Sequence, residues 1–343
     1  MLKYALGLYC LAISACQMGY ILKSAQNQFS MMAQRENIED TLKNNKLNDE
    51  QKRKLRLSQQ ARDFALNELQ LKETDNYKTF INLKRPYVSW VVHAAYKWEL
   101  KNYEWSYPLV GKMPYKGFFT EQEALDEAAL MEKQGYDTLV RGVSAYSTLG
   151  YFTDSVLSSM LRYKDYDLVN TIIHETVHTT LYIKNNADFN ERLAVFIGAK
   201  GTELFYKKLE GPNSATLKTV ELENADEQLF SKFIGSKIIE LNEWYKQNQI
   251  RNESERNVQF EKIKKDFSRD LTLQLKTKIY EKFKDQKINN AYLGLYKTYN
   301  QNLDDFEIVY NKVNRDILKF IEMMKTLEKS ENPEQDLKKL GEK

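Results

Sequence analysis

Apolar side chains recur at helical spacing through most of this chain and at strand spacing in one interval near its middle. From about Gly19 to Leu71, and again beyond Gly201, they lie three or four positions apart among many charged residues, a pattern typical of amphipathic helices. Beyond Gly201 the expected helices are Phe205–Leu209, Asp226–Gln249 and Glu253–Ile288. Between Tyr77 and Val143, short β-branched and aromatic runs are separated by Gly and Pro, which predicts strands. The expected strands are Tyr87–His93, Trp105–Val110, Tyr115–Phe119 and Thr138–Val143, with a helix at Glu121–Gly135.

These segments predict an α+β fold that is predominantly α-helical, with a small mixed β-sheet beside a central helix and long helical hairpins in the N- and C-terminal parts. With 343 residues and 42% hydrophobic composition, the chain can bury a sizeable core. The tail has only Leu337 and Leu340 to bury and is expected to be disordered. The expected division is a signal segment at 1–15, a helical hairpin at 16–76, an α+β core at 77–204, a helical region packed on that core at 205–327, and the tail at 328–343.

The central helix carries His174-Glu-Thr-Val-His178, the pattern HExxH. Residues four apart lie above one another on a helix, so the two imidazoles face one side at a spacing that a single metal ion can bridge. Glu175 projects from the neighbouring edge, where it can accept a proton from water without being a ligand. This is the arrangement of zinc peptidases. Chance matches to so short a pattern are common, but two of the three histidines in the chain lie in it.

A tetrahedral catalytic zinc needs a third protein ligand and leaves its fourth position open. Glu191 is the best candidate, because residues 184–188 predict a break that would place it on the first turn of a second helix. The predicted site is therefore one Zn²⁺ per chain, bound by His174, His178 and Glu191. Asp188-x-x-Glu191 also fits a helix-start capping box, and the two roles do not exclude each other.

The N-terminal residues predict a targeting segment. Lys3 gives a positive start, and the apolar run Tyr4–Ala15 is too short to span a bilayer. The run ends in Ile13-Ser-Ala-Cys16, which resembles a bacterial lipoprotein box, so Cys16 is the expected lipidation site; an ordinary signal peptide with an incidental Cys is the alternative. Gln17 follows rather than Asp, which favours an acyl anchor in the outer membrane, with the domain on its periplasmic face.

Composition argues against several other kinds of site and partner. Cleavage before Cys16 would remove Cys10, so neither a disulfide nor a Cys-ligated metal is expected. The net charge is only +3 and no basic block is interleaved with aromatics, which argues against a nucleic-acid partner. His93, in the first predicted strand, is expected to be a half-buried structural residue rather than a ligand.

Several longer strings carry a family resemblance. They are Trp105-x-Tyr-Pro-x-x-Gly111, Pro114-Tyr-Lys-Gly-Phe-Phe119, Gly142-Val-Ser-Ala-Tyr-Ser-Thr-Leu-Gly-Tyr-Phe152, Ser158-Ser-Met-Leu161, the HExxH run, Asp188-Phe-Asn-Glu191 and Asn289-Asn-Ala291. On these strings the chain resembles the putative aminopeptidase family of bacterial envelope proteins, from the lipoprotein box to about residue 310. The resemblance implies a zinc-dependent peptidase, with the activity itself inferred from the motif.

By the same resemblance, the segment after Asn289 returns to the site, where the hydroxyl of Tyr299, or alternatively of Tyr292, would stabilise an oxyanion. Arg141–Gly150 is expected to be the last strand before the motif helix and could pair with an extended peptide; a plain strand and turn is the other interpretation. Well-characterised zinc aminopeptidases carry a Gly-x-Met-Glu-Asn strand whose Glu holds the substrate amine, and no such string occurs here. Zinc hydrolysis is thus better supported than amino-terminal specificity.

The sequence therefore predicts zinc-dependent hydrolysis of peptide substrates by an aminopeptidase-like enzyme anchored in the bacterial cell envelope. The alternative is a non-catalytic envelope lipoprotein that acts as a scaffold and whose metal site is structural or vestigial. A structural site is expected to be closed by four protein ligands, whereas three are evident in the sequence. Oligomeric state and side-chain preference are not specified by these patterns.

Overall fold

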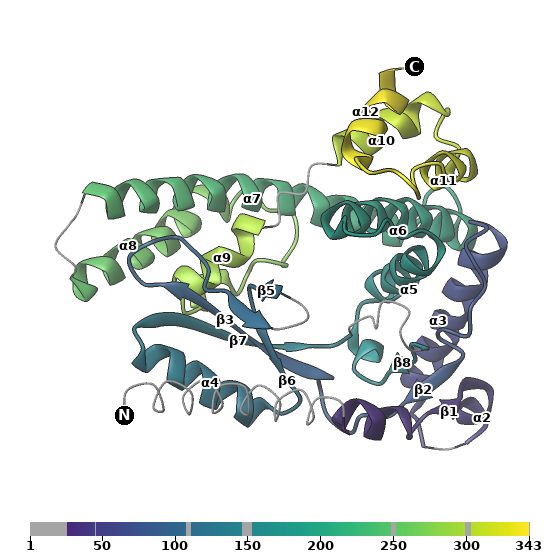
Figure 1. Cartoon of the computed structure of the whole chain (residues 1–343), viewed down its shortest axis with the longest axis horizontal. Helices are drawn as coiled ribbons and strands as arrows, with labels where there is room; N and C mark the ends of the chain where they lie inside the picture. Colours follow the sequence, from purple (N-terminus) through teal and green to yellow (C-terminus); the bar gives the residue numbers. More distant parts are fainter. Residues whose placement is uncertain are drawn as a thin grey trace, which may run out of the picture.

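The computed structural model describes residues 26–44, 46–107, 111–145, 153–247, 252–298 and 303–342. It confirms a predominantly helical α+β fold with small sheets (Figure 1). The α-helices are α2 Ile38–Lys43, α3 Asp49–Asn67, α4 Glu121–Lys133, α5 Asp165–Thr180, α6 Ala187–Glu210, α7 Ala215–Gln247, α8 Glu253–Asp266, α9 Asn290–Thr298, α10 Asp304–Lys312, α11 Ile317–Lys325 and α12 Pro333–Glu342. The strands are β1 Glu36–Asn37, β2 Thr79–Ile81, β3 Ser89–Tyr96, β4 Trp105–Tyr107, β5 Gly111–Met113, β6 Lys116–Phe118, β7 Tyr136–Val143 and β8 Val156–Leu157.

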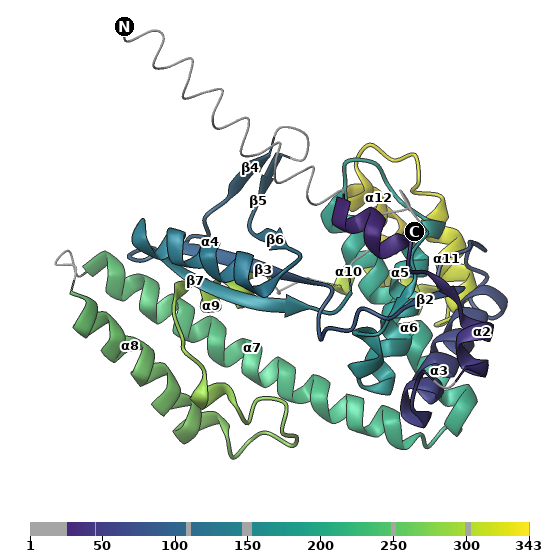
Figure 2. The ribbon, with the colours of Figure 1, turned by 90° about the horizontal axis from the view of Figure 1, so that it is seen from below.

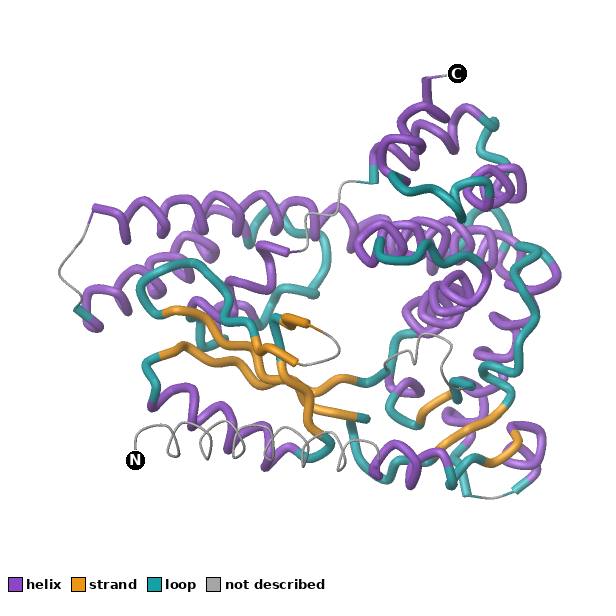
Figure 3. Tube along the Cα trace, in the orientation of Figure 1, coloured by secondary structure: helices purple, strands orange, loops and turns teal. Residues whose placement is uncertain are grey.

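The longest strands form an antiparallel sheet in the order β6-β3-β7, in which β7 is an edge strand. The alternating residues Trp90, Val92 and Ala94 of β3 face α4 and form a hydrophobic cluster with it. α9 contacts β3 and β7 from the other side, where α7 also lies (Figure 1). A second sheet, β1-β2-β8, is mixed, because β2 pairs antiparallel with β1 and parallel with β8. The two groups of strands lie apart in the fold (Figure 3).

The main core surrounds the motif helix. α5 packs between α3 and α6, and its residues Leu168, Val169, Ile172 and Ile173 are fully buried in the largest hydrophobic cluster. α3 begins after Asn48, which forms a capping box with Gln51. α7 then runs from this helical part past the β6-β3-β7 sheet (Figure 2). The site helix is therefore held on two sides by other helices. No helix in the described ranges is long and apolar enough to cross a bilayer.

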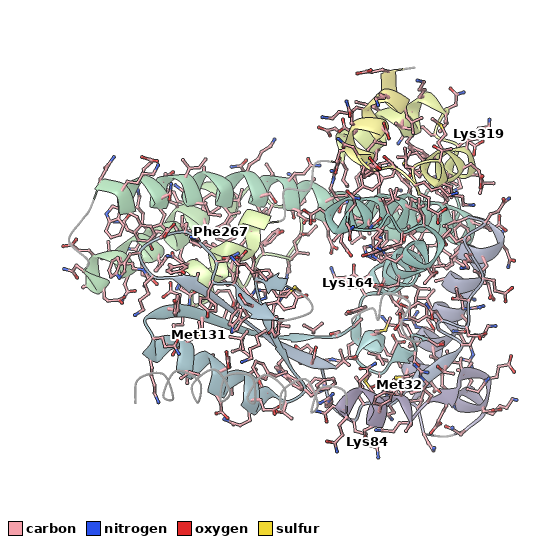
Figure 4. The ribbon with its side chains drawn as sticks, viewed as in Figure 1. Met32, Lys84, Met131, Lys164, Phe267 and Lys319 are labelled. Carbon is pink, nitrogen blue, oxygen red and sulfur yellow. The ribbon has the colours of Figure 1, made fainter. Side chains whose placement is uncertain are left out.

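A separate cluster joins α7, α8 and α9 and includes the buried side chains of Phe230 and Phe267. Figure 4 labels Phe267 beside these helices. The expected single helix Glu253–Ile288 is wrong: α8 ends at Asp266, and a π-helical turn and an irregular loop follow. The reason is Asp226, which is fully buried on α7 and accepts hydrogen bonds from the Lys276 and Thr277 amides and the Thr277 hydroxyl. These bonds stabilise the loop in place of helix.

The expected disordered tail is also wrong. Residues 333–342 form α12, which packs on α10, and Leu337 is fully buried in the main cluster. Glu334 accepts a 2.7 Å hydrogen bond from Arg192 of α6. Burial of Leu337 and Pro333 and the ion pair between Arg192 and Glu334 hold this charged segment against the core, although its composition is poor in apolar residues.

Asp165, the first residue of α5, links the motif helix to α3. Arg53 and Lys54 lie 2.6 and 2.8 Å from its carboxylate. Hydrogen bonds from Arg53, which outweigh the cost of burial, lower the pKa of Asp165 to about 2 from its usual 3.8. Because the pKa is depressed in the folded state, the pair contributes to stability above about pH 4, and that contribution is lost as the pH falls toward 2.

We expect Asp165→Asn to lower the free energy of unfolding by about 1 kcal/mol at pH 7, a small value because the carboxylate is partly exposed. The difference between the two proteins should disappear below about pH 2, where the aspartate is protonated in both folded and unfolded chains. Urea unfolding at pH 7 and over the acid range measures it. A difference that is constant across this range would contradict the account.

Candidate metal centre

Both histidines of the motif lie on one face of α5. They are four residues apart, and their Nε2 atoms are 3.2 Å from each other. The side chain of His178 is 4% exposed and that of His174 is 17% exposed, so the surrounding core restricts both rings. The helix thus presents two ring nitrogens at one point, as the spacing predicted.

Glu191 completes the cluster from α6. Its carboxylate oxygens lie 3.6 Å from Nε2 of His174 and 3.3 Å from Nε2 of His178. The neighbouring Asn190 is buried and closes the turn between the helices, since its side chain accepts from the amide of Ile183 and donates to the carbonyl of Ile183. This clamp sets where α6 starts and so where Glu191 faces. The capping-box alternative is wrong, because Asn186 precedes α6 and no side chain caps it.

The spacing of these atoms fits a tetrahedral zinc ion. Ligand atoms 2.0–2.1 Å from a tetrahedral metal are separated from each other by about 3.3 Å. The two Nε2 atoms are 3.2 Å apart, Oε2 of Glu191 lies 3.6 Å from that of His174, and Oε1 of Glu191 lies 3.3 Å from that of His178. One ligand atom from each residue lies within 4.8 Å of the other two. Within the described ranges, these three residues are the one group of His, Cys, Asp or Glu side chains placed to bind a metal. Glu191 is 48% exposed, so the cluster is accessible from the side of the carboxylate.

The charges agree with a cation site. Hydrogen bonds from both imidazoles lower the pKa of Glu191 well below its usual range, so the carboxylate is ionised at neutral pH. Burial alone would lower the pKa of His178, but the hydrogen bond to Glu191 and the charges of Glu191 and Glu175 raise it above the usual value. The pocket therefore stabilises positive charge at the point where the three side chains meet.

α6 can approach α5 closely because residue 198 is glycine. A Cβ atom at Gly198 would lie 3.3 Å from Cβ of His174. Gly201, one turn further along α6, faces Ile173 of α5 in the same way. These two positions allow the close helix contact that keeps Glu191 opposite the histidines.

Glu175 lies beside the ligands and also borders a small pocket. That pocket has a volume of about 20 Å³, enough for one water molecule, and Tyr77, Asp154 and Arg35 line it. Tyr77 has φ +62°, an uncommon value for an aromatic residue, and its amide donates to the carbonyl of Asp154 over 2.7 Å. Sequence reasoning missed these three residues, because nothing in their local pattern reveals a positive φ or a shared pocket.

The other predicted residues have different outcomes. Tyr299 and Cys16 lie outside the described residues. The hydroxyl of Tyr292 is 3.2 Å from that of Tyr296, in the cluster formed by α7, α8 and α9, and the structure does not bring it to the histidines. His93 lies on β3 against the ring of Tyr115, and the metal-binding group of the described chain does not include it. Burial, with the nearby positive charge of Arg141, lowers the pKa of His93 to about 4.

The edge strand β7 is separated from the motif helix in the sequence by β8, but the residues just after β7 lie beside the pocket that Glu175 borders. Its continuation, Ser144, accepts a 2.5 Å hydrogen bond from Ser159, and Ala145 lines the same pocket as Glu175. The carbonyl of Thr138 points away from β3, because it accepts from Asn289. Since the direction alternates along a strand, the main-chain groups of Val140 and Gly142 point outward too. No described strand pairs with this edge of β7, which runs toward the candidate centre.

This geometry defines a candidate metal-binding centre between two packed helices, next to an open sheet edge. The chain matches the family described as putative aminopeptidase over residues 19–340. The chain therefore belongs to the putative aminopeptidase family, and this membership supports a peptidase. No curated protein and no solved structure matches the chain.

Proposed function

We propose that this protein is a zinc-dependent peptidase, with aminopeptidase activity as the family name suggests. The observation that carries the proposal is the cluster of His174, His178 and Glu191. The two Nε2 atoms are 3.2 Å apart and each has one carboxylate oxygen of Glu191 within 3.6 Å, distances that suit the ligands of a tetrahedral zinc. The inference that the reaction is peptide hydrolysis rests on membership of the family.

Zinc bound there would supply a Lewis acid that activates water and polarises the scissile carbonyl. Glu175 would be the general base. It lies next to His174 on α5, and its negative charge is one of the causes that raise the pKa values of His178, Tyr77 and Tyr163. Its carboxylate accepts the proton of the attacking water and later transfers it to the amine that leaves. The bond that forms is between water oxygen and the peptide carbonyl carbon, and the bond that breaks is the peptide C–N bond.

The edge of β7 would orient the substrate. An extended peptide can add to a free strand through main-chain hydrogen bonds, which give affinity without regard to side chains. Val140 and Gly142 offer outward amide and carbonyl groups on the strand that ends beside the pocket of Glu175. A peptide on this edge extends toward the candidate centre.

The proposed location of the enzyme rests on the sequence alone. Cleavage before Cys16 and acylation of that residue would tether the domain to the periplasmic face of the outer membrane, by way of the segment before residue 26. Such an anchor leaves the domain itself in the aqueous compartment. The peptidase would then act on peptides within the cell envelope.

The scaffold alternative fits the site less well. A structural zinc site is normally closed by four protein ligands. In the described part of the chain three side chains converge, and Glu191 among them is 48% exposed. An accessible three-ligand arrangement is typical of a catalytic position.

The direct test uses the chain from Gln17 onward, loaded with zinc, and a mixture of defined peptides analysed by mass spectrometry. We expect hydrolysis that is lost on chelation and restored by about one equivalent of zinc. Stepwise release from the amino end would establish an aminopeptidase, whereas internal cuts would establish an endopeptidase. Intact peptides in the presence of bound zinc would favour the scaffold.

A further inference from the structure

Arg141 is an exposed arginine on β7 that has no partner among the residues that the structure describes. Its side chain makes no hydrogen bond or ion pair with the described residues. Among the described arginines, Arg56 alone shares this property. All the other described arginines bond to a carboxylate or a carbonyl. Arg56 lies on the outside of α3, whereas Arg141 lies on the edge strand that leads to the candidate centre.

The side chain of Arg141 lies on the sheet face opposite α4. Arg141 pairs with Val91, and directly opposed residues share a face, so Arg141 is on the other side from Trp90 and Val92, which pack on α4. α9 meets the strand nearer its start, where Asn289 and Asn290 bond to Thr138 and Asp137. Arg141 therefore stands between the part covered by α9 and the end of β7 next to the pocket of Glu175.

Asp137, the acidic residue on the same strand, does not neutralise the charge of Arg141. Asp137 is on the same strand and face, but it is buried, pairs with Arg256 and accepts from the amide of Asn290. His93 lies one pair along on the same face, and its burial, together with the charge of Arg141, lowers the pKa of His93 to about 4. At neutral pH this part of the face thus carries one positive charge, that of Arg141.

A peptide paired with the edge would place one residue directly against Arg141. Val140 and Gly142 point outward and would form the hydrogen-bonded pairs, so Arg141 would occupy the non-hydrogen-bonded position between them. Side chains are closest in such pairs, with Cβ atoms about 4.5–5.5 Å apart on the same face. A carboxylate there is within reach of the guanidinium.

From this geometry we propose that Arg141 makes the enzyme prefer peptides that carry an acidic residue beyond the scissile bond. The proposal rests on the proposed function, because it assumes a peptide on the β7 edge. Arg141 lies four positions before Ala145, which lines the pocket of Glu175, a distance of about 13 Å along an extended strand. For a substrate that runs antiparallel to β7, the acidic residue is about the third or fourth after the cleaved bond.

The test measures binding rather than turnover. Zinc-loaded Glu175→Gln protein is titrated with pairs of eight-residue peptides that differ only by Glu or Gln at one position, moved along the peptide. We expect the Glu peptide to bind about two- to five-fold more tightly at the third or fourth position after the cleaved bond, as for a cross-strand ion pair. In the background of Arg141→Glu the preference should reverse, and Lys should replace Glu as the favoured residue. Arg56→Glu, the matched control, should leave the preference unchanged.

Shorter peptides ending at the preferred position, with a free or an amidated carboxyl end, separate a side-chain carboxylate from a terminal one. A preference that needs the free end would assign Arg141 to the substrate C-terminus and overturn the side-chain proposal. Equal affinity for the Glu and Gln peptides, a preference that survives Arg141→Glu, or no binding of any peptide would also overturn it. A preference in binding without hydrolysis by the parent would leave the role of Arg141 intact and reject the proposed peptidase function.

Discussion

Replacing Glu175 with Gln is expected to reduce kcat for peptide hydrolysis by about 10²- to 10⁴-fold, the contribution of a well-placed general base. Gln is nearly the same size, so the packing of α5 should be preserved, but a neutral amide cannot accept the proton of the attacking water. The zinc content should not change, because His174, His178 and Glu191 are the ligands in this account.

Initial rates with a cleaved peptide, measured beside zinc content, test this expectation. Glu203→Gln is a suitable control, because Glu203 is a partly exposed carboxylate on α6 that pairs with Lys207 and lies away from the cluster. The control should keep parental activity. If Glu175→Gln retained the parental kcat, another group would have to be the base.

Replacing Glu191 with Ala is expected to lower zinc affinity by at least about 100-fold, since even changes outside the ligand shell commonly cost 10- to 100-fold. The two imidazoles would remain 3.2 Å apart on α5, but the negative charge that offsets the bound cation would be absent. Competition with a chromogenic chelator measures the affinity.

Asp188→Ala is the matched control for this variant. Asp188 is an exposed carboxylate on the first turn of the same helix, three residues before Glu191, and lies outside the metal-binding group. Its loss should change helix stability slightly through the helix dipole, with zinc affinity unchanged. Equal losses in both variants would mean that α6 had been destabilised and that no ligand had been identified.

The elements that the sequence predicted best are those with strong local patterns. The strands near Tyr87, Trp105 and Tyr115 and the helix after Thr120 were found because alternation and capping residues are read over a few positions. The helix expected through Ile288 and the disordered tail failed for a different reason. Asp226 binds a loop 50 residues away, and Leu337 is buried by distant helices, so both outcomes depend on tertiary contacts.

The candidate centre was predictable in part for the same reason. Helical spacing alone places His174 and His178 together, and a short break before Glu191 brings the next helix back. The hydrogen bonds of Asn190 and the small size of Gly198 position α6 against α5 so that Glu191 faces the histidines. Neither role could be recognised before the packing of the two helices was known. Tyr77 was missed because its role near Glu175 depends on a backbone conformation that its sequence does not signal.

The most direct test of the central claim is the zinc content of the chain from Gln17 onward, by elemental analysis after zinc loading and mild dialysis. The account predicts about one zinc per parent chain, as a three-ligand site requires, and little in Glu191→Ala. If the parent protein kept no zinc, the two histidines would be neighbours on a helix without a metal, and the proposed peptidase mechanism would be contradicted.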